Sequence, residues 1–237
     1  MIPWLDSDSP FPPPHSALLN PNGLLAAGGD LSPERLLAAY RQGIFPWYGE
    51  GDPILWWSPD PRMTLVPEAL KISRSLAKTL RNKAYEIRFD TAFDAVMTGC
   101  AGPRPDQPGT WITEDMRAAY NRLHQLGHAH SVEVWIDGEL GGGLYGVALG
   151  AVFFGESMFS NVRDASKIAL VALAQHCTAQ GIRLIDCQMH THHLASLGAR
   201  TMSRYHFSRR LAELIDYPRP AGPWTDAGYM NTPSCRS

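Results

Sequence analysis

Hydrophobic and polar positions form three neighbouring strand-like runs in the second half of the chain. The runs cover 130–136, 139–148 and 151–160, and each is rich in apolar and β-branched residues. Short turns at Asp137-Gly138 and Leu149-Gly150 separate them, and such turns are typical of hairpins. The pattern therefore predicts an antiparallel meander.

An apolar spacing of three and four residues predicts a helix before this meander. It begins after Thr113, places Met116, Tyr120 and Leu123 on one face, and ends at Gly127.

A second helix is predicted after the meander, with Asp164 as its N-cap and Gly181 as its end. Its body, 168–174, is nearly all apolar, so we expect it to be buried. The helix can return a strand over 182–188 parallel to the meander as a crossover. This order predicts an α+β fold with a mostly antiparallel sheet, like that of the acyltransferase superfamily typified by N-acetyltransferases. A helix over 192–198 and a basic segment over 200–210 complete it.

Proline divides the chain into two parts. Twelve of the 19 prolines lie at or before Pro67, and none lies between Pro108 and Pro218. Because proline blocks helix interiors and central strands, we expect a loop-rich N-terminal domain over 1–62 and the acyltransferase-like domain over 63–237. The first domain is predicted to hold one helix, beginning after Ser32 and ending at Gly43, with turns elsewhere.

The formal net charge is -2, from 21 Lys plus Arg and 23 Asp plus Glu, so bulk charge predicts no nucleic-acid partner. The segment 70–83 is a local exception, because it carries five cations and no acid. A helix there places Ile72, Leu76 and Leu80 on one stripe and cations on another. Phosphate binding and an ordinary solvated face both stay open for these cations, which are Lys71, Arg74, Lys78, Arg81 and Lys83.

Two carboxylates lie in apolar strands. Alternation places Asp186 and Gln188 on the face of the last strand that also carries Ile182 and Leu184. Glu156, in the sequence FFGESMF, is expected to share its face with Phe154 and Met158. If the two strands are neighbours, the acids converge on one cleft that favours a protonated amine. Two separate structural acids remain the alternative.

Other patterns predict no cofactor. The glycines of 141–146 match G-x-G-x-x-G but lie inside the meander and open no helix, which argues against a dinucleotide site. The histidines have no recognised ligand spacing, so we expect no metal. The loop SNVRDAS before the buried helix lacks the glycines that would grip the pyrophosphate of coenzyme A.

The cellular setting is predicted from the cysteines and the N-terminus. Cys100, Cys177, Cys187 and Cys235 are scattered, which suits a reducing compartment. The first residues lack a signal-peptide pattern, and no run approaches the ~18 apolar residues of a membrane span. We expect a cytoplasmic protein that is neither secreted nor inserted in a membrane.

Long sequence blocks point to one family. They read PNGLLAAGGDLSPERLLAAYRQGIFPWY, DPILWWSPDPR, GTWIT, HAHSVEVW, LYGVALGAVFFGESMFS, ASKIAL, and LIDCQ followed by HLASLGA. In these blocks, which run in family order from about Pro21 to Phe207, the chain resembles the leucyl/phenylalanyl-tRNA-protein transferase family. The resemblance implies transfer of Leu or Phe, and more weakly Met, from aminoacyl-tRNA to a protein's N-terminal Arg or Lys, which marks that protein for degradation.

The resemblance also implies roles for individual residues. Trp47 and Trp111 would flank the terminal adenosine of the tRNA, and Glu156 would lie at the aminoacyl site. Gln188 would contact the acceptor amine, while Asp186 polarises or orients Gln188; orientation and structural support are the alternative to a base. The basic segment would hold tRNA phosphates.

The meander and the buried helix offer an apolar pocket for the donor side chain. Its candidate residues come from both faces of the strands, so some are expected to be core; they are Leu144, Phe153, Met158, Leu173 and Ile185. Because an aminoacyl ester is already activated, the resemblance implies no ATP, metal or coenzyme. We also expect the protein to be a monomer. A coenzyme A-dependent N-acyltransferase and a non-catalytic RNA-binding module stay open as alternatives.

Overall fold

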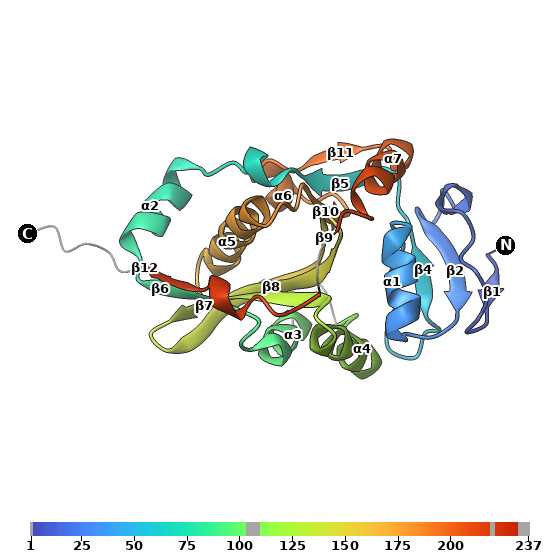
Figure 1. Ribbon diagram of the computed structural model, residues 1–237, viewed down its shortest axis with the longest axis horizontal. Helices are drawn as coiled ribbons and strands as arrows, with labels where there is room; N and C mark the ends of the chain where they lie inside the picture. The colour runs from blue at the N-terminus through green and yellow to red at the C-terminus, as the bar shows by residue number, and fades with distance from the viewer. Residues whose placement is uncertain (1, 103–109, 219–220, 232–237) are drawn as a thin grey trace, which may run out of the picture.

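The computed structural model describes residues 2–102, 110–218 and 221–231, and Cys235 lies outside these ranges (Figure 1). The predicted α+β fold is confirmed, because a large, mostly antiparallel sheet and a smaller sheet are combined with helices. Within the described residues, no helix has the length and hydropathy needed to cross a bilayer.

The large sheet has the strand order β11-β5-β10-β9-β8-β7-β6-β12. Its centre is the predicted meander, formed by β7 (Ala129–Ile136), β8 (Glu139–Leu149) and β9 (Val152–Ser160). The helix α5 (Ala165–Ala179) then leads to β10 (Leu184–Gln188), which pairs parallel with β9. The predicted crossover is therefore confirmed.

Four short strands extend the sheet beyond what the sequence predicted. They are β5 (Arg62–Leu65), β6 (Tyr85–Phe89), β11 (Arg200–Met202) and β12 (Tyr229–Asn231). Because β5 pairs with β10, residues made early and late in the chain lie side by side.

Helices cover both faces of the large sheet, and each face has its own hydrophobic core (Figure 1). On one face lies α5; on the other lie α3 (Phe93–Ala101) and α4 (Glu114–Gln125). Further helices are α2 (Arg74–Asn82), α6 (His192–Ser196), α7 (Arg204–Leu214) and the 3-10 turns η1 (Pro14–Ser16), η2 (Pro67–Ala69) and η3 (Thr225–Ala227).

The N-terminal residues form a second sheet, so the prediction of turns around a single helix is wrong. Its strands are β1 (Trp4–Leu5), β2 (Leu24–Gly28), β4 (Leu55–Trp57) and β3 (Phe45–Pro46), in that order. They are too short to produce a clear alternation between the prolines. The predicted helix, α1 (Pro33–Arg41), packs this sheet against the large domain and shares its core with α4.

Two helix starts follow the predicted capping, and two differ in detail. Ser32 and Thr113 cap α1 and α4 through their side chains. Asp164 occupies the N-cap position of α5, but its carboxylate accepts hydrogen bonds from Lys167 and Thr79 instead. The helix α2 begins only after Ser73, so Lys71 and Ile72 lie outside it.

Candidate active site

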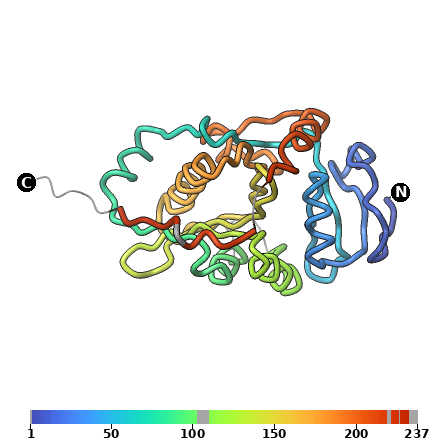
Figure 2. Tube along the Cα trace, in the orientation of Figure 1, coloured from blue at the N-terminus to red at the C-terminus, as the bar shows by residue number. Residues whose placement is uncertain are grey.

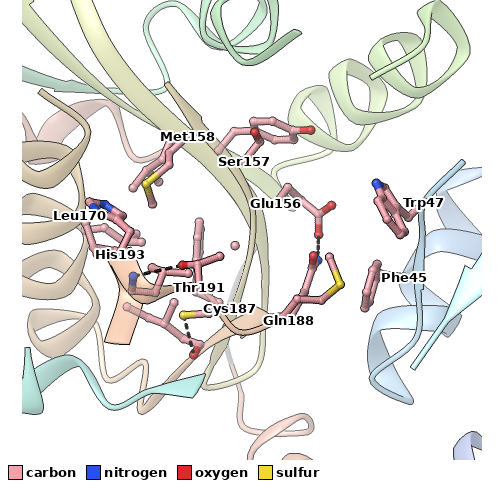
Figure 3. Close-up of a pocket in the computed structure, with 18 of the residues that line it drawn as sticks. Phe45, Trp47, Glu156, Ser157, Met158, Leu170, Cys187, Gln188, Thr191 and His193 are labelled. Atoms are coloured by element: carbon pink, nitrogen blue, oxygen red, sulfur yellow. Dashed lines mark hydrogen bonds between the residues drawn. The ribbon is translucent and has the colours of Figure 1, made fainter. Parts of the chain in front are cut away.

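A cavity of about 400 Å³ lies where the N-terminal domain meets β8, β9, β10 and α5 (Figure 3). Phe45, Pro46 and Trp47, in and after β3, line it from the N-terminal domain. Trp111, which precedes α4, also lines it. The structure therefore brings both predicted tryptophans to one cavity.

The inner wall of this cavity is apolar. All five predicted pocket residues line it, together with Leu170 and Leu194; the five are Leu144, Phe153, Met158, Leu173 and Ile185. The expectation that these residues divide between two faces of the sheet is wrong, because they all reach the side that α5 covers.

A β-bulge at Glu156 explains this difference. Tyr145 pairs with Ser157 and Gly146 pairs with Gly155, so Glu156 is the extra residue in β9. One inserted residue reverses the alternation beyond it. As a result Phe153 and Met158 share a side.

The expected common face of Phe154, Glu156 and Met158 is also wrong. Phe154 packs in the core on the face of α3 and α4, whereas Met158 packs on the face of α5. At the bulge, the side chain of Glu156 belongs to neither regular face of the sheet and lies at the polar end of the cavity.

Glu156 is held by three side chains from three other elements. Its Oε1 accepts hydrogen bonds from Tyr40 Oη and Gln188 Nε2, each at 2.8 Å, and its Oε2 accepts from Tyr120 Oη at 3.1 Å. The two tyrosine hydroxyls also lie within hydrogen-bond distance of each other; since each has one proton, a hydroxyl that donates to the other tyrosine does not at the same time donate to Glu156. Burial raises the pKa of Glu156 from 4.5 to about 7, although the tyrosine hydrogen bonds act to lower it. The carboxyl is thus close to half-ionised at neutral pH.

A second bulge sets the direction of Gln188. Asp186 pairs with Thr64 and Gln188 pairs with Met63, which makes Cys187 the extra residue in β10. Gln188 has a φ of 60°, a left-handed conformation that is uncommon for a residue with a side chain. Its Nε2 donates to Glu156 (Figure 3), so its carbonyl oxygen takes no part in that hydrogen bond.

Asp186 lies behind the cavity and is absent from its described wall. Its side chain is 0% exposed, and both oxygens bind the guanidinium of Arg62, Oδ1 to Nε at 2.9 Å and Oδ2 to Nη2 at 2.7 Å. Oδ1 also accepts the backbone N–H of Gln188 at 2.9 Å. Asp186 therefore fixes the backbone of Gln188 rather than its carboxamide.

Two predictions about Asp186 are wrong for this reason. It does not share a face with Gln188, because the bulge at Cys187 turns the strand between them. It does not share a cleft with Glu156, because it lies outside the cavity wall in a pair with Arg62, although its charge still acts to raise the pKa of Glu156. In addition, Ile182 precedes β10 and packs on the face opposite to Leu184.

Sequence reasoning missed Tyr40, Tyr120 and Arg62. Both tyrosines stand at apolar helix positions of the sequence pattern, and both are fully buried. A buried tyrosine hydroxyl needs a polar partner, which is the signal that could have linked them to a buried acid. Arg62 lies between the rings of Phe45 and Phe207, and its approach to Asp186 follows only from the pairing of β5 with β10.

The helix α2, which carries three of the predicted cations, lies at the end of the molecule that is remote from the N-terminal domain (Figure 1). Arg74, Lys78 and Arg81 are exposed on α2, and Lys71 is exposed before it. Lys83 is half-buried at the C-cap and donates to the backbone oxygen of Arg163 at 3.3 Å. Among the described residues, no group of three His, Cys, Asp or Glu side chains is placed to hold a metal ion.

Solved structures give a distant likeness only. A GCN5-related N-acetyltransferase from Kribbella flavida aligns over 72% of this chain and 61% of its own, with 11% identity and a TM-score of 0.38. L-PGS from Bacillus licheniformis aligns over 70% of this chain and 54% of its own, with 12% identity and a TM-score of 0.39. At these values the likeness carries no argument about function.

Sequence comparison places the chain among transferases that use aminoacyl-tRNA. The family model for leucyl/phenylalanyl-tRNA protein transferase matches residues 64–212, and that for its N-terminal domain matches residues 29–60. The chain belongs to the leucyl/phenylalanyl-tRNA-protein transferase family.

Relatives of the same description match over nearly the full length. The protein of Chromobacterium violaceum is 62% identical over 94% of this chain and 96% of its own length. The protein of Nitrosospira multiformis is 64% identical over 94% of this chain and 97% of its own length. The predicted activity is therefore confirmed: the chain is an N-end rule enzyme with Leu-tRNA or Phe-tRNA as donor and a protein as acceptor.

Proposed function

We propose that the cavity seats the donor amino acid and that Glu156 and Gln188 receive the acceptor amine. One observation carries this assignment: a hydrogen-bonded polar pair, Glu156 with Gln188, stands at the end of a largely apolar cavity of about 400 Å³. In this arrangement the aminoacyl ester lies between the apolar wall and the polar pair. Trp47 and Trp111 flank the terminal adenosine of the tRNA.

The apolar wall accounts for the class of donor. A Leu, Phe or Met side chain buries its surface against Leu144, Phe153 and Leu173, whereas a charged side chain would lose its hydration without a partner. One or two extra methylenes change binding by only ~1 to 3 kcal/mol, so one wall can serve all three donors.

The polar pair accounts for activation of the amine. An α-amino group with a pKa of about 7.7 to 8.0 is mostly protonated at neutral pH, and only its neutral form attacks an ester. The carbonyl oxygen of Gln188 accepts a hydrogen bond from this amine. Glu156, with its pKa raised to about 7, accepts the proton that the nitrogen releases.

The steps balance in atoms and charge. The amine nitrogen forms a bond to the ester carbonyl carbon, and the bond from that carbon to the tRNA ribose oxygen then breaks. The proton taken up by Glu156 passes to the departing ribose oxygen. Asp186, paired with Arg62, acts as a positioning residue because it holds the Gln188 backbone.

The charge of Glu156 also supports acceptors that begin with Arg or Lys, since a cation gains from a nearby carboxylate and a second acid does not. The tRNA body is held by the cations of α2, which contact phosphates without reading sequence. The predicted monomer stays part of this proposal, and the aminoacyl-tRNA donor supports a place in the cytoplasm.

Peptide labelling tests this proposal. The enzyme is incubated with radiolabelled Leu-tRNA and matched peptides that begin with Arg, Ala or Glu, each at subsaturating concentration. We expect acid-stable label mainly on the Arg peptide and none on an N-acetylated Arg peptide. Equal labelling of the three free peptides would contradict the proposed acceptor site.

A further inference from the structure

The last described residues, 222–231, form an extended segment that we name the C-terminal strap. Figure 2 shows it as the red trace that runs toward the end of the sheet beside α2. It begins where the N–H of Gly222 donates to the oxygen of Gly127 at 3.2 Å. The strap lies beyond 64–212, the stretch that the family model matches.

Trp224 anchors the strap in the interior. It is 7% exposed, and its backbone N–H donates to Asp90 Oδ2 at 2.7 Å. Its ring stacks on His130 with centroids 3.8 Å apart and also approaches Phe153, a residue of the cavity wall, at 5.9 Å. The start of the strap is therefore packed against the core that surrounds the cavity.

The end of the strap adds the strand β12 to the sheet and reaches α2. Tyr229 pairs with Ile87 and Asn231 with Tyr85 in an antiparallel register. The side-chain Nδ2 of Asn231 donates to two backbone oxygens, that of Leu80 at 3.0 Å and that of Lys83 at 2.8 Å. One amide NH₂ group carries two hydrogens, so it can serve both acceptors.

These two oxygens belong to the C-terminal end of α2. The N–H of Lys83 makes the last helical bond, to Thr79, so the oxygens from Leu80 onward have no partner further along the helix. Asn231 thus caps the helix from a distant part of the chain.

Little else holds α2 against the domain. Among its described residues only Leu76 is fully buried, and half-buried Leu80 packs against the same core, so hydrophobic packing fixes two points on one side of the helix. The other ties are polar: Thr79 donates to Asp164 at 3.3 Å, Lys83 Nζ donates to the oxygen of Arg163 at 3.3 Å, and Tyr85 Oη makes a longer bond of 3.5 Å to the oxygen of Leu80, which Asn231 approaches more closely. Removal of one of these ties leaves fewer contacts to fix the orientation of α2.

We propose that the C-terminal strap positions α2 for tRNA and that Asn231 is a positioning residue for the donor. This inference rests on the proposed role of the α2 cations in binding tRNA. The strap joins that helix to the core around the aminoacyl cavity. It thereby sets the distance and angle between the surface that holds the tRNA body and the cavity that receives its aminoacyl end.

The test compares two donors in full-length variants. Asn231→Ala removes the amide, and Asn231→Asp keeps its size but removes both N–H donors. Met230→Ala is the matched control, because Met230 lies in the same strand and is 67% exposed. The donors are Leu-tRNA and a minimal leucyl-adenosine ester, which cannot reach α2.

We expect both Asn231 variants to raise KM for Leu-tRNA by about threefold to tenfold, as the loss of two hydrogen bonds allows, with kcat unchanged. Their kinetics with leucyl-adenosine and all kinetics of Met230→Ala should match the parent enzyme. An unchanged KM for Leu-tRNA in both Asn231 variants, or an equal loss with both donors, would overturn the inference.

A companion variant separates this inference from the proposed function. Reversal of Lys78 and Arg81 to Glu should also raise KM for Leu-tRNA alone. If that reversal has no effect, the proposed tRNA role of α2 fails and the inference fails with it. If the reversal raises KM but the Asn231 variants do not, the strap inference alone is overturned.

Discussion

Glu156 and Gln188 both stand at β-bulges, on strands that lie next to each other. Each bulge inserts one residue and turns a side chain out of the regular alternation. The two insertions bring a carboxyl and a carboxamide within 2.8 Å of each other at one end of an apolar cavity. The reactive geometry therefore depends on two local irregularities of an otherwise regular sheet.

Glu156→Gln should change the pH dependence of the reaction. In the parent enzyme kcat/KM should rise through a pH of about 7 as Glu156 ionises, in addition to the limb of the acceptor amine. The variant should lose the limb at about 7 and have a rate lower by about 10² or more. A pH profile that keeps both limbs in the variant would exclude Glu156 as the proton acceptor.

The same substitution should alter stability in a defined direction. Because the folded protein raises the pKa of Glu156 from 4.5 to about 7, this group stabilises the fold fully below 4.5, and the contribution is lost as the pH rises through 7. The difference is on the order of 3 kcal/mol. Urea unfolding should therefore show that the parent loses stability relative to Glu156→Gln between pH 5 and 8; parallel curves would contradict this.

Asp186 provides a contrasting case, since its partner is Arg62. Asp186→Asn leaves a buried guanidinium without its counter-charge, which should cost about 3 to 5 kcal/mol of stability. The combined Arg62→Met and Asp186→Leu variant should lose less than the sum of the single losses, because no unpaired charge remains. Thermal unfolding measures this, and simple additivity would show that the two residues act separately.

The helix α2 combines an exposed cationic surface with a single fully buried residue, Leu76. Reversal of Arg74, Lys78 and Arg81 to Glu should raise KM for aminoacyl-tRNA. It should also reduce the slope of log KM against log salt concentration by about two to three. A minimal aminoacyl-adenosine donor should be unaffected.

The control for this reversal is an equal change of charge elsewhere. Arg122, Arg209 and Arg210 are exposed on α4 and α7. Their reversal to Glu should leave KM for aminoacyl-tRNA and its salt dependence near the values of the parent enzyme. If the two sets of variants behave alike, net charge rather than α2 governs tRNA binding.

The helix α5 contributes Leu170 and Leu173 to the cavity wall. Leu170→Phe fills part of the cavity, so transfer of Phe should fall relative to transfer of Leu by about tenfold, within the ~1 to 3 kcal/mol that such a change is worth. Leu170→Met keeps the volume and serves as the control. Competition between the two charged tRNAs gives the ratio, and an unchanged ratio would show that the donor side chain lies elsewhere.

The small N-terminal domain contributes a hydrogen bond to the candidate site of the large one. Tyr40 on α1 donates to Glu156 on β9, and this hydrogen bond acts to lower the pKa of the carboxyl. Tyr40→Phe should therefore move the limb of kcat/KM near pH 7 to higher pH. Tyr48→Phe is a matched control in the same domain, because the hydroxyl of Tyr48 bonds Thr113 instead. A limb that shifts equally in both variants would indicate a general disturbance of the domain.

The sequence was sufficient to predict the central part of this fold. The meander, the buried helix and the crossover strand each span enough residues for their period to show, and they predicted the large sheet. The sequence did not predict the strands β2 and β4, because their short sequences have no clear alternation and the two strands are defined by pairing with each other. Family blocks led to Trp47, Glu156 and Gln188, whereas Tyr40 and Arg62 reach the site only through contacts between distant segments. The bulges that moved Asp186 away from the cavity depend on register, which one strand cannot reveal.

The position of β5 has a consequence for synthesis on the ribosome. Arg62 in β5 is separated by 124 positions from Asp186, its partner in β10. At roughly 5 to 20 residues per second, the nascent chain therefore carries β5 for many seconds before its place in the sheet exists. All four residues of this strand are buried in the finished protein. A chain released before Leu184 would expose them as an unpaired edge, which marks the truncated product for chaperones and proteases.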